Sequence, residues 1–248
     1  MKKIVVIAGA TKGLGKELAL SFSRSGYEVI GLYHADMATA ERVRDEFAAS
    51  QLRGDFLKLD IAKDGGWDEF NAIIDSKAGR HFTLFANASA PFAPKPFHTL
   101  DWSEISSLID VNVKGTFALT QRLLPHMVKA RAGRIVTILS EAVDDTPKGF
   151  SGYVIAKSAL DGLTRCLAEE YSSRGIHVFS VSPGFMDTSL TKNWSEHLKA
   201  MIFADPSRVT SPAVVAERIL RICEDPGTKG QGENYLLRGN SLNYFAGV

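Results

Sequence analysis

Hydrophobic residues along this chain follow two alternating patterns, and each predicts a different element. Short, nearly continuous apolar runs, such as residues 4–8, are typical of strands buried on both faces of a sheet. Longer stretches in which apolar residues recur every three or four positions predict amphipathic helices. The first pattern predicts strands at residues 4–8, 28–33, 56–59, 82–86, 134–139, 176–181 and 234–237.

Predicted helices lie between these strands, so strand and helix alternate along the whole chain. In this order, successive strands are parallel neighbours with right-handed connections, and helices cover both faces of the sheet. No glycine–serine linker, charge block or internal repeat divides the sequence. We therefore predict one doubly wound α/β domain over residues 1–248, with a parallel sheet of about seven strands. The first helix is predicted to end at residues 25–26, and the others lie at 40–50, 67–75, 102–110, 111–129, 153–172 and 213–223.

Composition sets limits on the kind of protein. Hydrophobic residues make up 45% of the 248 positions, which is ample for the core of a globular domain. The formal net charge of +1 gives no field that would attract nucleic acid or an anionic membrane, and no apolar run is long enough to span a bilayer. The histidines lack metal-ligand spacing, so no metal site is predicted. Cys166 and Cys223 lie far apart in apolar, helix-like stretches, which predicts buried free thiols and a cytoplasmic protein.

Three glycines follow the first predicted strand and open the first helix. Gly9, Gly13 and Gly15 allow a tight turn, close approach of the backbone to a ligand, and close packing of the helix on the sheet. The amino end of the helix adds N–H donors and a favourable dipole for a pyrophosphate. We therefore predict a dinucleotide site, the alternative being a turn with a purely structural role. The loop residues expected to contact the cofactor are Gly9, Thr11, Lys12, Gly13, Leu14 and Gly15.

The spacing of these glycines resembles that of the short-chain dehydrogenase/reductase family, and further family motifs follow in the same order. An asparagine ends the fourth predicted strand, a second asparagine lies in a predicted helix, and a serine ends the fifth strand. A Tyr-x-x-x-Lys pair and a Pro-Gly pair come next. The resemblance spans nearly the whole chain and implies a Rossmann fold and a nicotinamide-dependent oxidoreductase. The matching residues are Asn87, Asn112, Ser140, Tyr153, Lys157, Pro183, Gly184 and Thr188.

The family resemblance also implies roles for four catalytic residues. Tyr153 and Lys157 are four residues apart, so a helix presents them on one face. By resemblance, Tyr153 is the acid/base, and Lys157 lowers its pKa and holds the cofactor ribose. Ser140 donates to the substrate oxygen, and Asn112 holds a water that links Lys157 to solvent. Taken singly, the Tyr–Lys pair is also typical of an exposed helix face, Ser140 of a strand cap and Asn112 of a helix cap.

Three positions depart from the family pattern. Ala8 stands where the family usually has a threonine, and Ala86 and Ser89 modify the motif around Asn87. The threonine hydroxyl often ties the first strand to the fourth. We expect that the chain loses some hydrogen bonds at these positions and keeps the chemistry.

The end of the second predicted strand bears on the choice of cofactor. A carboxylate there would accept hydrogen bonds from the ribose hydroxyls of NAD and repel a ribose phosphate. This chain has no carboxylate there until Asp36, while Lys12 and His34 offer donors to a phosphate. We therefore predict NADP(H), with NAD less favoured. Further predicted cofactor contacts are Tyr33, His34, Asp60, Ile61, Asn87, Ala88, Tyr153, Lys157, Pro183, Gly184 and Thr188.

The substrate is expected to bind under a loop at about residues 185–208. Its apolar residues predict either a lid or ordinary helix packing, and the pattern does not choose between them. A second candidate wall lies in the proline-rich stretch before it, at Pro91, Phe92, Pro94 and Phe97. The apolar residues of the loop are Met186, Leu190, Trp194, Leu198, Met201 and Phe203.

The subgroup that the chain resembles most in overall character is the 3-oxoacyl-carrier-protein reductases. Arg131 and Arg174 fall where such reductases place basic residues that meet an acidic carrier protein. Free ketones or sugars are equally compatible substrates. The resemblance also implies a homotetramer or homodimer, paired through the helices around residues 112–129 and 153–172. Two other functions stay open: an NAD-dependent secondary-alcohol dehydrogenase, and a sensor that binds NADPH without catalysis.

Overall fold

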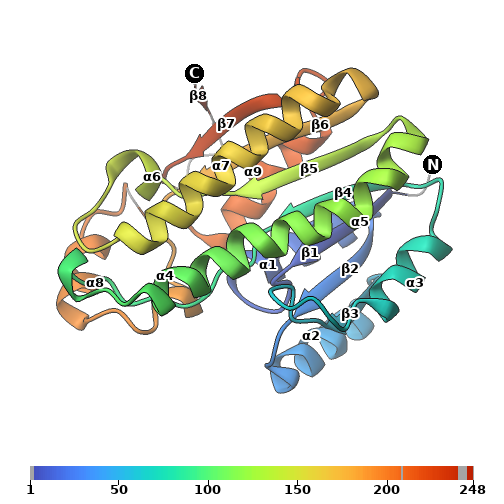
Figure 1. The fold of residues 1–248 in the computed structure, drawn as a ribbon. Coiled ribbons are helices and arrows are strands. Elements are labelled where there is room, and N and C mark those ends of the chain that lie inside the picture. Colours follow the sequence, from blue (N-terminus) through green and yellow to red (C-terminus); the bar gives the residue numbers. More distant parts are fainter. Residues whose placement is uncertain (1–2, 208, 240–244, 248) are drawn as a thin grey trace.

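The continuous apolar runs form the central strands of one twisted sheet (Figure 1). The computed structural model describes residues 3–207, 209–239 and 245–247. The strand order is β3-β2-β1-β4-β5-β6-β7-β8; β1 to β7 are parallel, and β8 is antiparallel to β7. The predicted parallel sheet is therefore confirmed, and β8 has no counterpart among the predicted strands. The strands are β1 (Lys3–Ala8), β2 (Glu28–Tyr33), β3 (Gly54–Lys58), β4 (His81–Ala86), β5 (Gly133–Ile138), β6 (Ile176–Pro183), β7 (Gln231–Leu237) and β8 (Phe245–Gly247).

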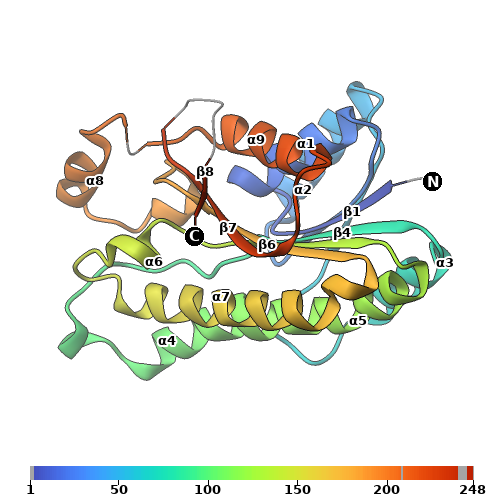
Figure 2. The ribbon, with the colours of Figure 1, turned by 90° about the horizontal axis from the view of Figure 1, so that it is seen from above.

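Helices cover both faces of the sheet, as predicted. Seen from above, α1, α2 and α9 lie on one side, and α4, α5 and α7 on the other (Figure 2). The short helices α6 and α8 extend the fold beyond the sheet. The helices are α1 (Gly13–Arg24), α2 (Met37–Ala49), α3 (Asp68–Ser76), α4 (Trp102–Ile109), α5 (Gly115–Ala130), α6 (Ala142–Asp145), α7 (Ser151–Tyr171), α8 (Glu196–Phe203) and α9 (Pro212–Glu224).

Alternate residues of the central strands pack on opposite sides of the sheet. Val5 and Ile7 belong to the core under α1, α2 and α9, whereas Ile4 and Val6 belong to the core under α3, α5 and α7. Side chains of a strand alternate between its two faces, so only a strand covered on both faces needs an uninterrupted apolar run. The run at residues 4–8 is explained in this way.

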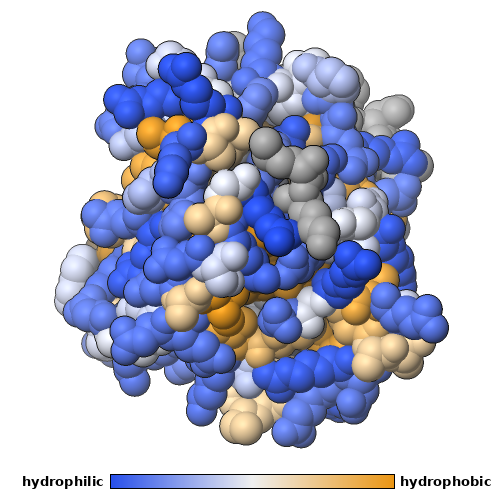
Figure 3. All heavy atoms as spheres, turned by 90° about the vertical axis from the view of Figure 1, so that its right-hand side faces the viewer, coloured by the Kyte–Doolittle hydropathy of each residue, from blue (hydrophilic) through white to orange (hydrophobic). Residues whose placement is uncertain are grey.

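A third apolar cluster lies beyond the strands and prepares the site. It joins α4, α6 and α7 to the segment after β6, with Phe150, Tyr153, Phe185 and Trp194 among its buried members. In Figure 1 these elements gather on the left, where the strands end. The opposite end, where the strands begin, has a largely hydrophilic surface with separate hydrophobic areas (Figure 3). The chemistry predicted from the loops therefore falls at one end of the molecule.

The predictions that both cysteines are free and that both are buried have different outcomes. Cys166 and Cys223 are both free, but only Cys223 is buried. The predicted burial of Cys166 is wrong because that position lies on an exposed face of α7. Within residues 3–207, 209–239 and 245–247, no helix combines the length and apolarity needed to cross a membrane, and no group of side chains has the makeup of a metal site.

Candidate active site

The loop between β1 and α1 has a backbone conformation that favours glycine. Gly9 has φ of 74° and Gly13 has φ of 48°, in the left-handed region that favours glycine. A Cβ on Gly15 would lie 1.9 Å from the Gly9 carbonyl oxygen. The loop is fixed to β2, since the N–H groups of Gly9 and Ala10 donate to the Leu32 carbonyl at 2.9 and 3.0 Å. This cradle fits the pyrophosphate of a dinucleotide at the amino end of α1.

Loops after two other strands meet the glycine loop. Asn87, which follows β4, lies with its side-chain nitrogen 3.6 Å from the position of a Cβ on Gly9. Thr188, which follows β6, approaches the corresponding position on Gly13 to 3.2 Å. Thr11 and Leu14 are buried within the loop. The structure therefore brings together the residues that the sequence predicts around a cofactor, including the neighbouring Ala88, Pro183 and Gly184.

Asp36 changes the electrostatics expected at the ribose end of the site. Lys12 forms an ion pair with the Asp36 carboxylate, which also accepts a hydrogen bond from the Thr39 N–H at 3.0 Å. These partners, the Lys12 hydrogen bond first, hold the pKa of Asp36 well below its usual range. The cation predicted to meet a ribose phosphate is therefore next to a carboxylate. Sequence reasoning missed this contact because Asp36 lies beyond the end of β2.

The other predicted contacts of the adenosine half lie nearby. His34 Nε2 is 3.3 Å from Asp60 Oδ2, so the exposed imidazole lies over the residue expected near the adenine. Tyr33 is buried, with its hydroxyl 3.5 Å from the Arg44 guanidinium. Ile61 is buried against Gly115, where an added Cβ would lie 2.7 Å from the Ile61 side chain.

The predicted catalytic residues converge where β5 ends and α7 begins. Tyr153 and Lys157 are both buried on the inner face of α7, and Lys157 Nζ is 5.7 Å from the centre of the Tyr153 ring. Lys157 donates to the Ile138 carbonyl at 2.7 Å. Ser140 follows β5, and its hydroxyl oxygen accepts a hydrogen bond from the Ala142 N–H at 3.2 Å, which leaves the hydroxyl hydrogen to donate elsewhere. The phenol of Tyr153, the amino group of Lys157 and the hydroxyl of Ser140 thus lie in the same region of the site.

Burial controls the ionisation of this pair. It raises the pKa of Tyr153 to about 12, and the hydrogen bond with Ser140 acts in the opposite direction. Burial also lowers the pKa of Lys157 to about 7. The resemblance implied a Tyr153 pKa lowered by Lys157; here the net shift of the Tyr153 pKa is upward, because apolar surroundings disfavour the charged form of both groups. The site as described therefore favours a neutral phenol.

Asn112 lies in a short π-helix, residues Asp110–Lys114, between α4 and α5. It is fully buried, and its amide nitrogen donates to the Leu108 carbonyl at 2.9 Å and to Ser89 Oγ at 3.3 Å. Its amide oxygen has no partner among the described residues. A buried acceptor of this kind needs a hydrogen-bond donor such as a water. Ser89, a departure from the family pattern, here provides one of the contacts that fix the amide.

The predicted substrate side is a small cavity with aromatic walls. The cavity measures about 60 Å³, and Ser140 and Tyr153 provide polar groups in its lining. Phe92 stacks on the Tyr153 ring, with ring centres 4.5 Å apart and planes 10° apart. Pockets for drug-sized ligands usually measure several hundred Å³, so this cavity is small, and Phe92 is the wall that covers Tyr153. The remaining lining comprises Leu139, Phe150, Pro183, Gly184, Phe185, Met186, Thr188, Leu190, Thr191 and Trp194.

The two candidate substrate walls divide into residues that meet the cavity and residues that do not. Of the loop at 185–208, Met186, Leu190 and Trp194 line the cavity, and the structure does not describe Arg208. Leu198 and Phe203 pack behind the lining, whereas Met201 is exposed. Of the second wall, Phe92 meets the cavity, and Phe97 is 68% exposed. Phe150, at the start of α7, was not among the predicted wall residues; the apolar pattern does not distinguish it from core.

Arg131 and Arg174 lie at the other end of the molecule from Tyr153. Arg131 follows α5 and Arg174 precedes β6, so both lie where strands begin, and a Cβ on Gly175 would lie 2.4 Å from the Arg131 carbonyl oxygen. The 21-residue helix α7 separates Arg174 from Tyr153, a distance of about 30 Å at 1.5 Å per residue. Arg174 stands beside an open groove between α3, α5 and the end of α7.

Comparison with known proteins agrees with these observations. A family model described as short chain dehydrogenase matches residues 3–199. A 3-oxoacyl-acyl-carrier-protein reductase of Staphylococcus epidermidis is 31% identical over 199 residues, which cover 80% of this chain and 81% of that protein. The reductase of the same name from Pseudomonas aeruginosa is 31% identical over 194 residues, or 78% of each chain.

Solved structures with the same fold carry nicotinamide cofactors. A 3-ketoacyl-(acyl-carrier-protein) reductase from Brucella melitensis, complexed with NADH, has a TM-score of 0.85 and 25% identity over 96% of this chain and 97% of its own. A candidate NAD(P)-dependent gluconate 5-dehydrogenase from Beutenbergia cavernae with bound NADP has a TM-score of 0.83 and 24% identity, over 95% of this chain and 94% of its own. At this identity, the second similarity is evidence for the fold and not for the reaction. Fold, motifs and family model agree, and the chain belongs to the short chain dehydrogenase family of oxidoreductases.

Proposed function

We propose that this protein is an NADPH-dependent reductase that transfers a hydride to a ketone, with a 3-oxoacyl thioester or a related ketone as substrate. The observation that carries the proposal is the convergence of Ser140, Tyr153 and Lys157 on a cavity beside the glycine loop. The names of the relatives support the ketone class. The apolar, aromatic lining suits an acyl or similar hydrophobic substituent better than a sugar.

In this reaction the chain's own residues stabilise the oxygen of the carbonyl. The bound nicotinamide supplies the hydride. Ser140 and Tyr153 donate hydrogen bonds to the carbonyl oxygen, on which negative charge develops, and Tyr153 then delivers its proton. Lys157, with its pKa near neutrality, passes a proton to the phenolate, and a water on the Asn112 amide oxygen restores it from solvent. The apolar walls exclude bulk water and strengthen these contacts.

A second candidate is an NAD-dependent dehydrogenase that oxidises a secondary alcohol through the same residues. The ion pair between Lys12 and Asp36 favours it, since Asp36 offsets the positive charge available to a ribose phosphate. Against this, His34 and Lys63 add cationic or donor groups around Asp60 at the same end of the site. The presence of Ser140, Tyr153 and Lys157 disfavours the third function, a sensor without catalysis.

The positions of Arg131 and Arg174 bear on how an acyl carrier protein would deliver a substrate. An acyl carrier protein bound at Arg131 and Arg174 would be about 30 Å from Tyr153 of the same chain. Carrier docking there would suit delivery of the substrate to the site of another protomer, in the proposed homodimer or homotetramer. A cytoplasmic location belongs to this proposal, because two free thiols suit a reducing compartment.

The proposal is tested by following oxidation of NADPH and of NADH with a 3-oxoacyl thioester and with simple ketones. The wild type is compared with Tyr153→Phe, which keeps the ring and its stacking on Phe92 and removes only the hydroxyl group. We expect turnover with a 3-oxoacyl thioester, preference for NADPH, and a loss of about a thousandfold or more in kcat for the variant. Faster turnover with NADH and secondary alcohols would favour the dehydrogenase, and tight NADPH binding without turnover of any ketone would favour the sensor.

A further inference from the structure

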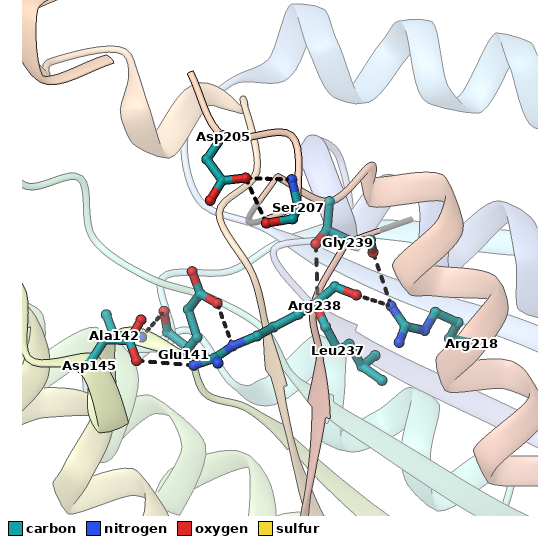
Figure 4. Close-up of polar contacts among 11 residues, drawn as sticks. Glu141, Ala142, Asp145, Asp205, Ser207, Arg218, Leu237, Arg238 and Gly239 are labelled. Carbon is teal, nitrogen blue, oxygen red and sulfur yellow. Dashed lines mark hydrogen bonds and ion pairs between the residues drawn. The ribbon is translucent and has the colours of Figure 1, made fainter. Parts of the chain in front are cut away.

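Glu141 is a buried carboxylate next to Ser140 that the proposed mechanism does not use. It is fully buried, and its backbone N–H donates to the Pro183 carbonyl at 3.1 Å. A buried carboxylate is stable only when it is paired and hydrogen-bonded. One partner is the Arg238 guanidinium, whose Nε lies 3.0 Å from Glu141 Oε2 (Figure 4). A charge at this position therefore serves a contact that reaches from the end of β5 to the end of β7.

The same guanidinium holds a second carboxylate. Arg238 Nη2 donates to Asp145 Oδ1 at 3.0 Å, and Figure 4 shows Arg238 extended between the two acids. Glu141 precedes the short helix α6 and Asp145 is its last residue, four positions later, so their charges would otherwise repel each other across one turn. The positive charge of Arg238 attracts both carboxylates, offsets their mutual repulsion and holds the turn that begins at Ser140.

A second arginine fixes the backbone that carries Arg238. Arg218, buried on α9, donates to the carbonyl oxygens of Arg238 at 3.4 Å and Gly239 at 3.2 Å. On the other side, the Gly184 N–H donates to the Leu237 carbonyl at 2.9 Å. The segment after β7 is therefore tied to α9 and to the loop after β6, and through Arg238 to the turn that carries Ser140.

This network is connected to the Ser140 hydroxyl through α6. Ser140 Oγ accepts a hydrogen bond from the N–H of Ala142, and Ala142 is the first residue of α6. A shift of α6 therefore changes the direction in which the Ser140 hydroxyl points. Donors that stabilise a developing oxyanion have to be fixed before the reaction, and a small displacement is costly in rate. We propose that Glu141 and Arg238 are positioning residues for Ser140, an inference that rests on the proposed role of Ser140 in the reduction.

The test combines rate, affinity and coupling between residues. Glu141→Gln removes the charge and keeps the shape, and Arg238→Lys keeps the charge and removes the forked donor. We expect each to lower kcat about tenfold through a misplaced Ser140, with the KM for NADPH changed less than about twofold. Glu217→Gln, which breaks the exposed pair with Arg221 on α9 (2.7 Å), is the matched control and should leave kcat unchanged.

The decisive comparison is made in the Ser140→Ala background. If Glu141 acts through Ser140, Glu141→Gln lowers kcat by less than about twofold once the hydroxyl is absent, whereas independent effects would multiply. Multiplying effects, or a fall in melting temperature with kcat intact in both Glu141→Gln and Arg238→Lys, would overturn the inference. If Glu141→Gln does not fold, Arg238→Lys replaces it in the same comparison. Full activity of both Ser140→Ala and Tyr153→Phe would instead overturn the proposed function. If Ser140→Ala is slow while Glu141→Gln and Arg238→Lys are fully active, only this inference is overturned.

Discussion

The two halves of the site are built by different means. At the glycine loop, the backbone makes the surface: Gly9 and Gly13 adopt left-handed conformations, and Gly15 leaves no room for a Cβ. At the substrate side, side chains make the surface, with Phe92, Phe150 and Trp194 in edge-to-face contact. A backbone surface depends on a few glycines at fixed spacing, whereas a side-chain surface can change shape through one rotamer. The first half is therefore expected to be rigid and intolerant of substitution, and the second adaptable.

The sharpest way to test this contrast is Gly15→Ala. The new methyl group would lie 1.9 Å from the Gly9 carbonyl oxygen and 2.8 Å from the Asn87 side chain, so the loop has to shift. We expect the affinity for NADPH to fall by about a hundredfold or more, measured by fluorescence titration. Gly65→Ala is the control, because nothing lies within 4 Å of a Cβ there. Unchanged affinity in Gly15→Ala would show that the loop is not rigid.

The buried Lys157 between the two halves gives a pH-dependent stability. Its pKa is about 7 in the folded chain and 10.5 in the reference state, so between these values the unfolded chain binds more protons than the folded one. Stability therefore rises with pH through this window, by up to about 1.4 kcal/mol per unit, until Tyr153, with its raised pKa, reverses the trend above about pH 10. Lys157→Met should flatten the rise, measured by urea unfolding at several pH values. The same slope in the variant would contradict the assignment.

Phe92→Ala tests whether the substrate side adapts. Removing the ring that covers Tyr153 enlarges the cavity, so we expect bulky ketones to gain about fivefold in kcat/KM relative to small ones. Phe97→Ala lies in the same segment, is 68% exposed before substitution, and should leave the ratio unchanged. A uniform loss for all ketones would mean that Phe92 supports the loop and does not limit substrate size.

The smallest expected effect is at Asp36. An asparagine at this position keeps a side-chain oxygen that can accept from the Thr39 N–H and cap α2, and it removes the negative charge that offsets Lys12. We expect Asp36→Asn to shift the kcat/KM ratio toward NADPH over NADH by about threefold, because the contact is solvent-exposed. Asp45→Asn, at an exposed position of α2, is the control. A shift toward NADH would contradict the position assumed for the ribose phosphate.

The sequence predicted the elements whose pattern is local. β2 has the predicted bounds, whereas α2 begins at Met37, three residues before residue 40, because the Asp36 side chain caps it. The apolar pattern cannot locate a helix start that depends on a cap, since capping residues are polar and the first turn need not be buried.

Contacts between distant parts of the chain could not be predicted in this way. Glu141 and Arg238 are 97 residues apart, and only the fold places them together. The stacking of Phe92 on Tyr153 and the raised pKa of Tyr153 likewise depend on how loops close over the end of the sheet. Motif spacing identified the reacting groups, but their surroundings, and so their ionisation, are properties of the folded chain.

The π-helix at Asp110–Lys114 constrains how the length of this protein can change in evolution. A π-turn contains one more residue per hydrogen-bonded ring than an α-turn. Deleting one residue there would let α4 and α5 run on as an ordinary α-helix and rotate one against the other by about 100°. Either Asn112 would lose its contact with Ser89 or Gly115 would lose its contact with Ile61. Insertions and deletions are therefore expected to accumulate in the surface loops of related chains, while the number of residues from Trp102 to Ala130 stays constant.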